Sequence, residues 1–304
     1  MKLKTKDLLT LNELSKNELI AIIDNSIKLK KDLKRGICKP LLKNKTLAMI
    51  FQKPSTRTRV SFEAGMYQLG GHALNLTADE LQLRRGETIQ DTSKTLSRYV
   101  NAIMARVYLH EEIEILAKNS PVPVINGLSD SFHPCQTLAD LMTIKEKKKK
   151  LNGLKLAWVG DGNNVCNSMI YGCAKTSIDI SIATPKGYEP NQKVINESKK
   201  SVQVELLNDP VAAVKDADVV ATDTFVSIHH QTTDRAKDFL PRFQVSASLM
   251  KKANPNAIFM HCLPAKRGQE VTSEVMDGPQ SVVWDEAENR LHAQKALLVA
   301  ILQV

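Results

Sequence analysis

The residues best suited to binding chemistry lie at positions 51–63, which read FQKPSTRTRVSFE. An apolar, strand-like run precedes this motif, and a helical pattern follows it. Ser55, Thr56 and Thr58 therefore fall at a helix N-terminus, where backbone N–H groups lack intrahelical partners and the helix dipole is positive. With the guanidinium of Arg57 beside them, these groups are suited to binding a phosphate dianion. An ordinary helix cap with solvated arginines is the alternative, and two arginines spaced by one residue make it the weaker one.

Two more short motifs follow strand-like runs, HPCQ at residues 133–136 and HCLP at 261–264. Each string alone is weak evidence, because a lone histidine is more often structural and a buried cysteine is more often inert. Three motifs in this order, each after a strand-like run, are strong evidence. Together they resemble the motifs of the aspartate/ornithine carbamoyltransferase family, most closely its ornithine branch, and the resemblance covers nearly the whole chain.

The resemblance implies a site for carbamoyl phosphate, which combines a phosphate with an electrophilic carbonyl. Such a site must hold the phosphate and stabilise the oxyanion that forms when an amine attacks the carbonyl. By resemblance, the catalytic groups are Arg57, Arg106, His133, Asp223 and Cys262. The implied carbamoyl-phosphate ligands are Ser55, Thr56, Arg57, Thr58, Gln82, Arg106, His133, Gln136, Cys262, Leu263 and Arg290.

Gln82 lies in a polar segment, LQLRRGE at residues 81–87. In the family this segment reaches into the site of a neighbouring subunit, so the resemblance implies a homotrimer, or a multiple of it, with shared active sites. Arg84 stands where the family usually has glycine. An added positive charge fits an anion site, and an exposed basic turn explains Arg84 about as well.

The resemblance assigns the amino-acid substrate, L-ornithine, to Asn164, Asp223, Ser227 and Ile228. Asp223 would bind the α-ammonium group and Asn164 the α-carboxylate. Residues 223–230 read DTFVSIHH, whereas the family pattern is Asp-x-x-x-Ser-Met-Gly, so Ile228 and His229 depart from it. This departure leaves open an alternative acceptor amine, such as putrescine or an acylated ornithine.

Cys262 bears on the choice of acceptor. The ornithine side-chain amine, like that of lysine, has a pKa near ~10.4 and must lose a proton before it attacks. A thiol or thiolate beside the amine can orient it without forming an acyl-enzyme. Relatives that carbamoylate aspartate generally have proline here, so the cysteine favours a basic amino acid. The expected reaction converts carbamoyl phosphate and L-ornithine to L-citrulline and phosphate, in arginine biosynthesis, with no metal and no cofactor.

Strand-like and helix-like segments alternate after residue 40, which predicts an α/β fold of parallel sheets with helices on both faces. The first helix is expected at 12–34, with Ser15 or Asn17 as its cap. Strands are expected at 47–51, 72–76, 102–107, 123–125, 154–159, 178–183, 204–206, 218–221, 257–260 and 282–284. Further helices are expected at 58–69, 89–99, 111–118, 136–146, 164–176, 190–200, 210–215, 246–252, 272–276 and 286–302.

A chain of 304 residues exceeds the usual size of a single hydrophobic core, so two domains are expected. A polar, lysine-rich break at 145–150 marks the boundary. We expect a carbamoyl-phosphate-binding domain over residues 1–146 and an ornithine-binding domain over 147–285. By resemblance, the helix within 286–304 packs back on the first domain.

The net charge of +9 raises nucleic-acid binding as an alternative. The basic residues are scattered, however, and only 5% of residues are aromatic, which leaves little for base stacking. A cationic surface also suits anionic small substrates. The glycines of Gly160-x-Gly162 invite a dinucleotide-binding interpretation, but Val165 stands where its third glycine should be. We therefore expect neither a nucleic acid nor a nucleotide as partner.

No apolar run approaches the ~18 to 20 residues of a membrane span. The basic N-terminal segment has no apolar region behind it, so we expect an unprocessed cytoplasmic protein without a membrane partner. The five cysteines show no Cys-x-x-Cys spacing, which favours reduced thiols over disulfides or a zinc site.

Overall fold

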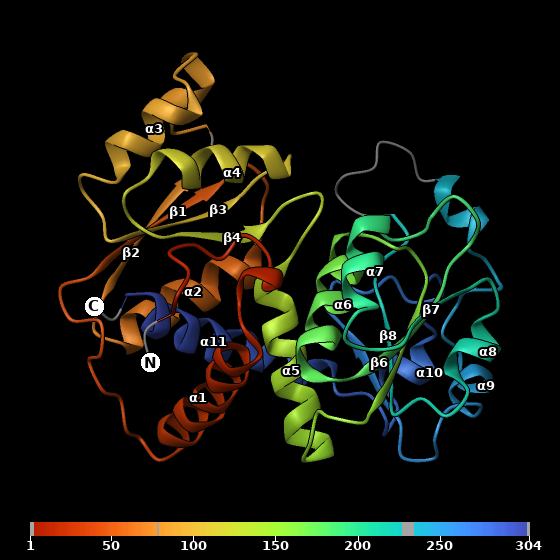
Figure 1. Ribbon diagram of the computed structural model, residues 1–304. Coiled ribbons are helices and arrows are strands. Elements are labelled where there is room, and N and C mark those ends of the chain that lie inside the picture. The colour runs from red at the N-terminus through yellow and green to blue at the C-terminus, as the bar shows by residue number, and fades with distance from the viewer. Residues whose placement is uncertain (1–2, 78, 227–233, 303–304) are drawn as a thin grey trace. The chain divides into compact units, whose positions relative to one another are not determined.

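The structure, a computed structural model, describes residues 3–77, 79–226 and 234–302. The chain divides into two compact units, Met1–Met142 with Glu288–Val304 and Thr143–Ala287. Each unit contains one parallel sheet with helices on both faces (Figure 1). This confirms the predicted α/β class with two parallel sheets.

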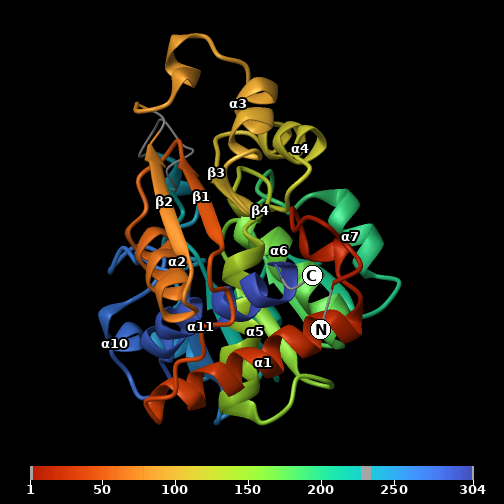
Figure 2. The same cartoon turned by 90° about the vertical axis from the view of Figure 1, so that its left-hand side faces the viewer.

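The first unit is built on a four-stranded sheet in the order β2-β1-β3-β4. Helices α3 and α4 cover one face, and α1, α2 and α11 cover the other (Figures 1 and 2). The strands are β1 (Thr46–Phe51), β2 (His72–Thr77), β3 (Ala102–Arg106) and β4 (Val124–Leu128). The helices are η1 (Leu11–Glu13), α1 (Lys16–Lys34), α2 (Thr56–Gln68), η2 (Gln82–Arg85), α3 (Ile89–Leu96), α4 (His110–Asn119), α5 (Pro134–Lys148), which continues into the second unit, and α11 (Val283–Leu302), which begins there.

Strand β1 lies in the middle of this sheet, and its residues 47–51 are all buried. A continuous apolar run is expected where helices cover both faces of a parallel strand. Strand β1 is followed along the chain by β2 at one edge of the sheet, and β3 is followed by β4 at the opposite edge, so the strand order reverses between β1 and β3. In open α/β sheets, ligands bind beyond the carboxyl ends of strands at such a switch point. Phe51 and Arg106 pair in register and mark these two strand ends.

Helix α11 joins the first unit through buried polar contacts. The ammonium of Lys30, in α1, donates to the Asn289 side chain at 2.7 Å and lies 3.1 Å from the Glu288 carboxylate. Farther along, Lys295 donates to Gln68 of α2 at 2.8 Å. These contacts confirm the predicted return of the C-terminal helix to the first domain.

The second unit contains a five-stranded sheet in the order β7-β6-β5-β8-β9. Helices α6 and α7 cover one face, and α8, α9 and α10 cover the other (Figure 1). The strands are β5 (Lys155–Val159), β6 (Asp179–Ala183), β7 (Val204–Leu207), β8 (Val219–Thr222) and β9 (Ile258–His261). The helices are α6 (Asn164–Thr176), α7 (Gln192–Ser198), α8 (Pro210–Val214), η3 (Asp234–Asp238), α9 (Ala247–Met250) and α10 (Ser273–Met276). The switch point of this sheet falls between β5 and β8.

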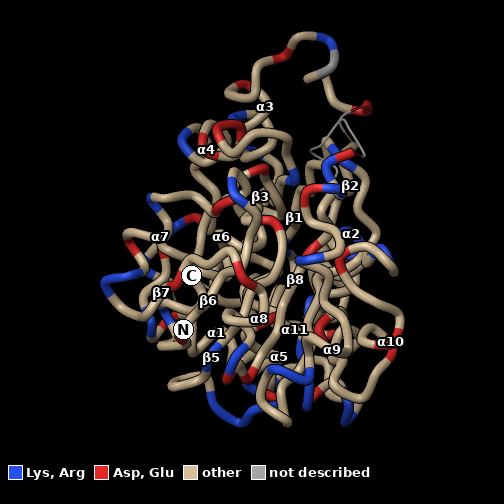
Figure 3. The backbone as a smooth tube through the Cα atoms, turned by 90° about the vertical axis from the view of Figure 1, so that its right-hand side faces the viewer, with Lys and Arg blue, Asp and Glu red and all other residues tan. Residues whose placement is uncertain are grey.

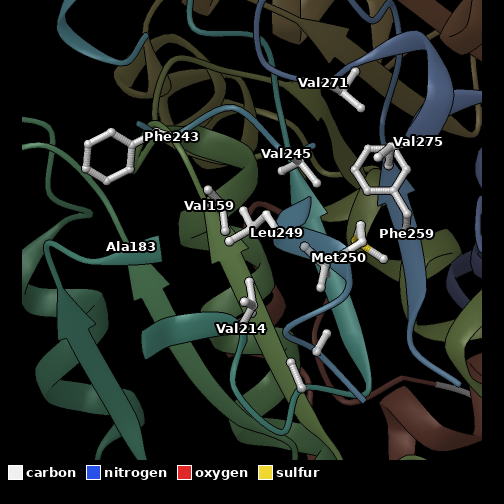
Figure 4. Packing of buried hydrophobic residues seen from close by; sticks show 14 of the residues in the cluster. Val159, Ala183, Val214, Phe243, Val245, Leu249, Met250, Phe259, Val271 and Val275 are labelled. Carbon is white, nitrogen blue, oxygen red and sulfur yellow. The ribbon is translucent and has the colours of Figure 1, made fainter. Parts of the chain in front are cut away.

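The core beneath α8, α9 and α10 consists of aliphatic and phenylalanine side chains. Figure 4 shows Val159 of β5 and Phe259 of β9 in one cluster with Leu249 and Met250 of α9. Burial of each such side chain stabilises the fold by about 1.5–3 kcal/mol before entropic costs. This core fixes the strands whose ends carry the candidate amino-acid ligands.

The two glycines that resemble a dinucleotide motif have a packing role. Gly160 has φ +126°, a conformation that L-residues rarely adopt. A Cβ atom on Gly162 would lie 2.3 Å from the backbone nitrogen of Pro190. Local geometry therefore accounts for both glycines without a nucleotide.

The prediction of a strand at 282–284 is wrong. Ser281 forms one isolated bridge with Phe259, and α11 begins at Val283. Val283 is fully buried because it packs in the core of the second unit. A short apolar run does not distinguish a buried strand from the first turn of a buried helix.

The predicted helix at 12–34 begins later than expected. Helix α1 starts at Lys16, and Ser15 caps it in a reciprocal capping box with Glu18. Residues 11–13 form the separate turn η1. Ser15, one of the two predicted caps, is the one that the structure uses.

Lysine and arginine positions are spread along both units and interspersed with acidic ones, as Figure 3 shows. Within the described residues, no helix has both the length and the apolar character to cross a membrane. All five cysteines are thiols, as expected.

Candidate active site

In the first unit, the STRTR motif forms the beginning of α2, as its pattern predicts. Ser55 is the N-cap in an extended conformation, and its hydroxyl accepts the backbone N–H of Thr58 at 3.4 Å. Thr56 and Arg57 occupy the first turn. The helix therefore presents its positive end at the carboxyl edge of the sheet. The backbone N–H of Gln52 donates to the Arg106 carbonyl at 3.0 Å, which ties this segment to the end of β3.

His133 lies among three arginines. It is buried, and burial is the main reason that its pKa lies well below the usual value. The positive charges of Arg290, Arg106 and Arg57, in this order of influence, lower the pKa further. The imidazole is therefore neutral at physiological pH. A neutral ring in a strongly positive environment can donate a hydrogen bond to a developing oxyanion. We call Arg57, Arg106, His133 and Arg290 the arginine cluster.

Arg290 connects three helices of the first unit. One guanidinium nitrogen donates to the Gln136 side chain at 2.6 Å, and another donates to the Thr58 hydroxyl at 3.2 Å. The Gln136 amide nitrogen in turn donates to Asp140 at 2.8 Å. All four residues are buried. Their side chains are therefore ordered before any ligand binds, which lowers the entropic cost of binding.

Lys53 is a further basic residue of this region, and no role was predicted for it from the sequence. Its ammonium lies 4.2 Å from the centre of the Tyr108 ring. Burial, followed by the charge of Arg106, lowers the pKa of Lys53 to about 8. With Ser55 and Thr56, Lys53 lines a cavity of about 650 Å³. Its position inside the 51–63 motif was the one available signal.

Two further residues of this unit differ in their surroundings: Gln82 is a predicted donor ligand, and Cys135 has no predicted role. Gln82 is exposed in η2. Cys135, the third residue of HPCQ, is buried and donates to the Asn126 carbonyl at 3.4 Å. Burial raises the pKa of the Cys135 thiol to about 12, so this cysteine is an inert packing residue.

In the second unit, the candidate ligands follow the carboxyl ends of β5, β8 and β9. Asp223 follows β8, and both of its carboxylate oxygens accept hydrogen bonds. One accepts from the Asn163 amide at 2.7 Å. The other accepts from the backbone N–H of Thr224 at 2.7 Å and from the Cys262 thiol at 3.1 Å. We call Asn163, Asp223 and Cys262 the carboxylate cluster. Asn164, a predicted ligand, is buried at the start of α6.

The HCLP motif is held by a buried histidine. The Nδ1 atom of His261 accepts the backbone N–H of Leu263 at 2.9 Å, so Nε2 carries the proton. Nε2 lies 3.2 Å from the Glu270 carboxylate and donates to it. Leu263 has φ +59°, in the left-handed region that a leucine seldom adopts. The hydrogen bond from its N–H helps to maintain this conformation.

A second buried carboxylate, Asp161, lies near Asp223 and forms an ion pair with Arg235 at 2.6 Å. Burial raises the pKa of Asp161 to about 6, the Arg235 charge opposes this increase, and the Asp223 charge adds to it. The guanidinium also lies 4.5 Å from the Tyr188 ring. No motif in the sequence marks Asp161 or Arg235, because a single ion pair has no sequence signature.

Asp223, His261 and Cys262 place oxygen, nitrogen and sulfur atoms within 4.8 Å of one another, as a metal site could. Both ring nitrogens of His261 already have protein partners, and the thiol already donates to Asp223. A hydrogen-bond network accounts for this group of side chains. The predicted ornithine ligands Ser227 and Ile228 lie outside the described residues.

Comparison with protein families assigns both halves of the chain. Residues 6–146 match the carbamoyl-phosphate-binding domain of aspartate/ornithine carbamoyltransferases, and residues 152–301 match their aspartate/ornithine-binding domain. The chain therefore belongs to the aspartate/ornithine carbamoyltransferase family.

Individual relatives are similar over almost their full lengths. An ornithine carbamoyltransferase of Cenarchaeum symbiosum is 60% identical over 301 residues, which cover 99% of each chain. The anabolic ornithine carbamoyltransferase of Pyrococcus furiosus is 56% identical over 98% of this chain and 96% of its own. A solved structure of the Pyrococcus furiosus enzyme superimposes with a TM-score of 0.94, covering 97% of this chain and 96% of its own.

Proposed function

We propose that this chain transfers the carbamoyl group of carbamoyl phosphate to the side-chain amine of L-ornithine, giving L-citrulline and phosphate. The observation that supports L-ornithine as the acceptor is the Cys262 thiol, which is hydrogen-bonded to Asp223. Aspartate-specific relatives generally have proline at this position. The full-length similarity to ornithine carbamoyltransferases supports the same acceptor. One of these relatives is anabolic, and we propose an arginine-biosynthetic setting here.

The first unit supplies the donor site. In this proposal the phosphate is bound by Ser55, Thr56, Arg57 and Thr58 at the N-terminus of α2, where N–H groups, hydroxyls and a guanidinium converge. The positive charge of Arg106 helps to neutralise the phosphate. Neutral His133 donates a hydrogen bond to the carbonyl oxygen as this oxygen becomes an oxyanion.

Gln136 and Arg290 complete the donor site. Gln136 binds the carbamoyl amide, and Arg290 fixes the Gln136 side chain through its 2.6 Å hydrogen bond. In the second unit, Leu263 stays a predicted ligand of the carbamoyl group.

The second unit supplies the acceptor site. Asp223 binds the α-ammonium group of ornithine and Asn164 binds its α-carboxylate, with Ser227 and Ile228 contributing from the following segment. Cys262 orients the side-chain amine as it loses its proton. The amine, having released one proton to solvent, attacks the carbonyl carbon to form the tetrahedral intermediate. As this intermediate collapses, the C–O bond to phosphate breaks, and a second amine proton leaves with the phosphate. No covalent enzyme intermediate is required.

An assay of ureido-product formation with a panel of amines tests the proposal. L-Ornithine, putrescine, N-acetylornithine and L-aspartate are each offered with carbamoyl phosphate, and kcat/KM is compared. We expect L-ornithine to be preferred by at least about 100-fold, because putrescine lacks both α-substituents, N-acetylornithine lacks the α-ammonium charge, and L-aspartate lacks the side-chain amine. Preference for putrescine or an acylated ornithine would contradict the assignment.

We also propose that three subunits, or a multiple, share active sites through Gln82. Three large apolar side chains on α2 and the edge strand β2 support an interface there: Val60 is 56% exposed, Tyr67 82% and Leu74 38%. Mixing inactive Arg57→Ala subunits with inactive Gln82→Ala subunits should restore activity, because some interfaces would then combine two wild-type residues. Hybrids that exchange subunits without regaining activity, or an active monomer in light scattering, would contradict this arrangement.

A further inference from the structure

Asn163 lies in the loop between β5 and α6, next to the predicted ligand Asn164, and its orientation is fixed by hydrogen bonds. Its side-chain oxygen accepts the backbone N–H groups of Val165 at 3.0 Å and Cys166 at 3.1 Å. Backbone N–H groups can only donate, so the amide nitrogen must be the atom that faces Asp223. That nitrogen donates to the Asp223 carboxylate at 2.7 Å.

This hydrogen bond determines how the Asp223 carboxylate can rotate. The Thr224 N–H and the Cys262 thiol both reach the same oxygen, Oδ1. The Asn163 amide donates to the other oxygen, Oδ2. With one donor on Oδ2 and two on Oδ1, the plane of the carboxylate is defined. The position of the Cys262 sulfur is coupled to the same plane.

An amide is chemically suited to this position. It donates a hydrogen bond without carrying a charge, so the negative charge of Asp223 stays available to a substrate ammonium group. A lysine or arginine here would compete with that ammonium. The nearby carboxylate of Asp161 has its own partner in Arg235 at 2.6 Å. His261 is also close to Asp223, and both of its ring nitrogens are hydrogen-bonded, one to Leu263 and the other to Glu270.

We propose that Asn163 is a positioning residue for the acceptor half of the reaction: it orients the Asp223 carboxylate, and through it the Cys262 thiol, for the incoming amine. This inference rests on the proposed function, which assigns Asp223 and Cys262 to ornithine. Asn163 itself acts through these two residues. As the N-cap of the 13-residue helix α6, it is held by the backbone of the second unit.

The test uses Asn163→Asp, which has nearly the same shape and keeps the helix cap, because a carboxylate also accepts the Val165 and Cys166 N–H groups. The change removes the donor and places a second carboxylate against Asp223. We expect kcat/KM for ornithine to fall by about 10- to 100-fold, the range expected for a lost hydrogen bond to a charged group. The KM for carbamoyl phosphate should remain within about twofold of the wild-type value.

The pH profile separates positioning from a general structural effect. Two facing carboxylates retain a shared proton, so the acid limb of kcat/KM for ornithine should shift to higher pH in Asn163→Asp. Asn163→Ser keeps a cap on a shorter side chain, which withdraws the donor from Asp223 without adding charge, so it should lower kcat/KM without this shift. Asn191→Asp is the matched control, since Asn191 caps α7 by accepting the Lys193 N–H. It should behave as wild type.

A second measurement is independent of turnover. The alkylation rate of Cys262 by iodoacetamide, followed by peptide mass spectrometry, should fall in Asn163→Asp because added negative charge disfavours the thiolate. Exposed Cys38 provides the internal reference.

The possible outcomes distinguish the inference from the proposed function. Wild-type kinetics, pH profile and alkylation rate in Asn163→Asp would overturn the inference. An equal loss of affinity for both substrates, with altered circular dichroism, would also overturn it. If the wild-type protein does not carbamoylate ornithine, the proposed function fails, and the alkylation rates still decide whether Asn163 orients Asp223 and Cys262.

Discussion

The arginine cluster of the first unit and the carboxylate cluster of the second are built by opposite electrostatic means. In the first, the positive charges of three guanidiniums act on a neutral imidazole, and hydrogen bonds among buried side chains hold Arg290 in place. In the second, a carboxylate is held by neutral donors: an amide, a backbone N–H and a thiol. Each arrangement leaves one sign of charge available for a ligand.

The difference shows how one topology can be adapted to two ligands. Both clusters lie beyond the carboxyl ends of parallel strands at a switch point of the sheet. The positive end of α2 and its arginines suit a dianion, whereas Asp223 suits an ammonium group. Substitution of Arg57 or of Asp223 should therefore alter the binding of one substrate and leave the other nearly unchanged, whereas Cys262 is a predicted ligand of both.

The largest effect is expected for Arg57→Ala. Loss of a guanidinium that binds phosphate and stabilises the oxyanion should lower kcat by about 100- to 1,000-fold. Citrulline formation measures the effect, and circular dichroism checks the fold. Arg98→Ala removes an exposed arginine of the same unit and should retain wild-type turnover. A correctly folded Arg57→Ala protein with near-normal turnover would refute the assignment of residues 55–58.

Asp223→Asn tests the carboxylate cluster of the second unit. Removal of the charge opposite the α-ammonium group should raise the KM for ornithine by about 10- to 100-fold, with little change for carbamoyl phosphate. Initial-rate kinetics with each substrate varied in turn give both constants. The control is Asp209→Asn, which keeps the cap of α8. Equal changes in the two KM values would show that the clusters are not functionally separate.

The depressed pKa of His133 predicts how stability depends on pH. In the unfolded chain this histidine has a pKa near ~6.5, so the unfolded state binds more protons once the pH falls below that value. Stability should therefore decrease as the pH falls through 6.5, by up to about 1.4 kcal/mol per pH unit, until the folded-state pKa is reached. Urea unfolding between pH 7 and pH 5 should show a shallower slope in His133→Gln than in wild type. The exposed-site variant His72→Gln should keep the wild-type slope, and an unchanged slope in His133→Gln would contradict the prediction.

The smallest effect concerns Lys53. Because its pKa is lowered to about 8, its positive charge is lost between pH 7 and pH 9. A nearby charge in a partly hydrated site contributes on the order of 1 kcal/mol, so the KM for carbamoyl phosphate should rise by about two- to fivefold over this range. Lys53→Met should show a raised, nearly constant KM, whereas exposed Lys43→Met should follow wild type. A similar rise in Lys53→Met would assign the pH dependence to another group.

Much of the local structure followed from the sequence. The STRTR segment predicted a capped helix after a strand, and Ser55 caps α2. Alternating strand-like and helical runs predicted two parallel sheets, and most elements lie within a few residues of their expected ranges. These features depend on propensities and caps within one or two helical turns. The predicted strand at 282–284 is an exception. It is a short apolar run, and periodicity alone does not show whether such a run is a buried strand or the first turn of a buried helix.

The sequence by itself determined the residue types available for chemistry, the helix cap that presents an anion site, and the alternating pattern that requires parallel sheets. Only the tertiary structure decided which distant side chains meet and which lose water. Arg290 reaches Thr58 across 232 positions, and Asn163 reaches Asp223 across 60. The neutral state of His133 and the lowered pKa of Lys53 likewise arise from burial and neighbouring charges. Desolvation and long-range electrostatics depend on distances in space, and the spacing of residues along the chain does not specify those distances.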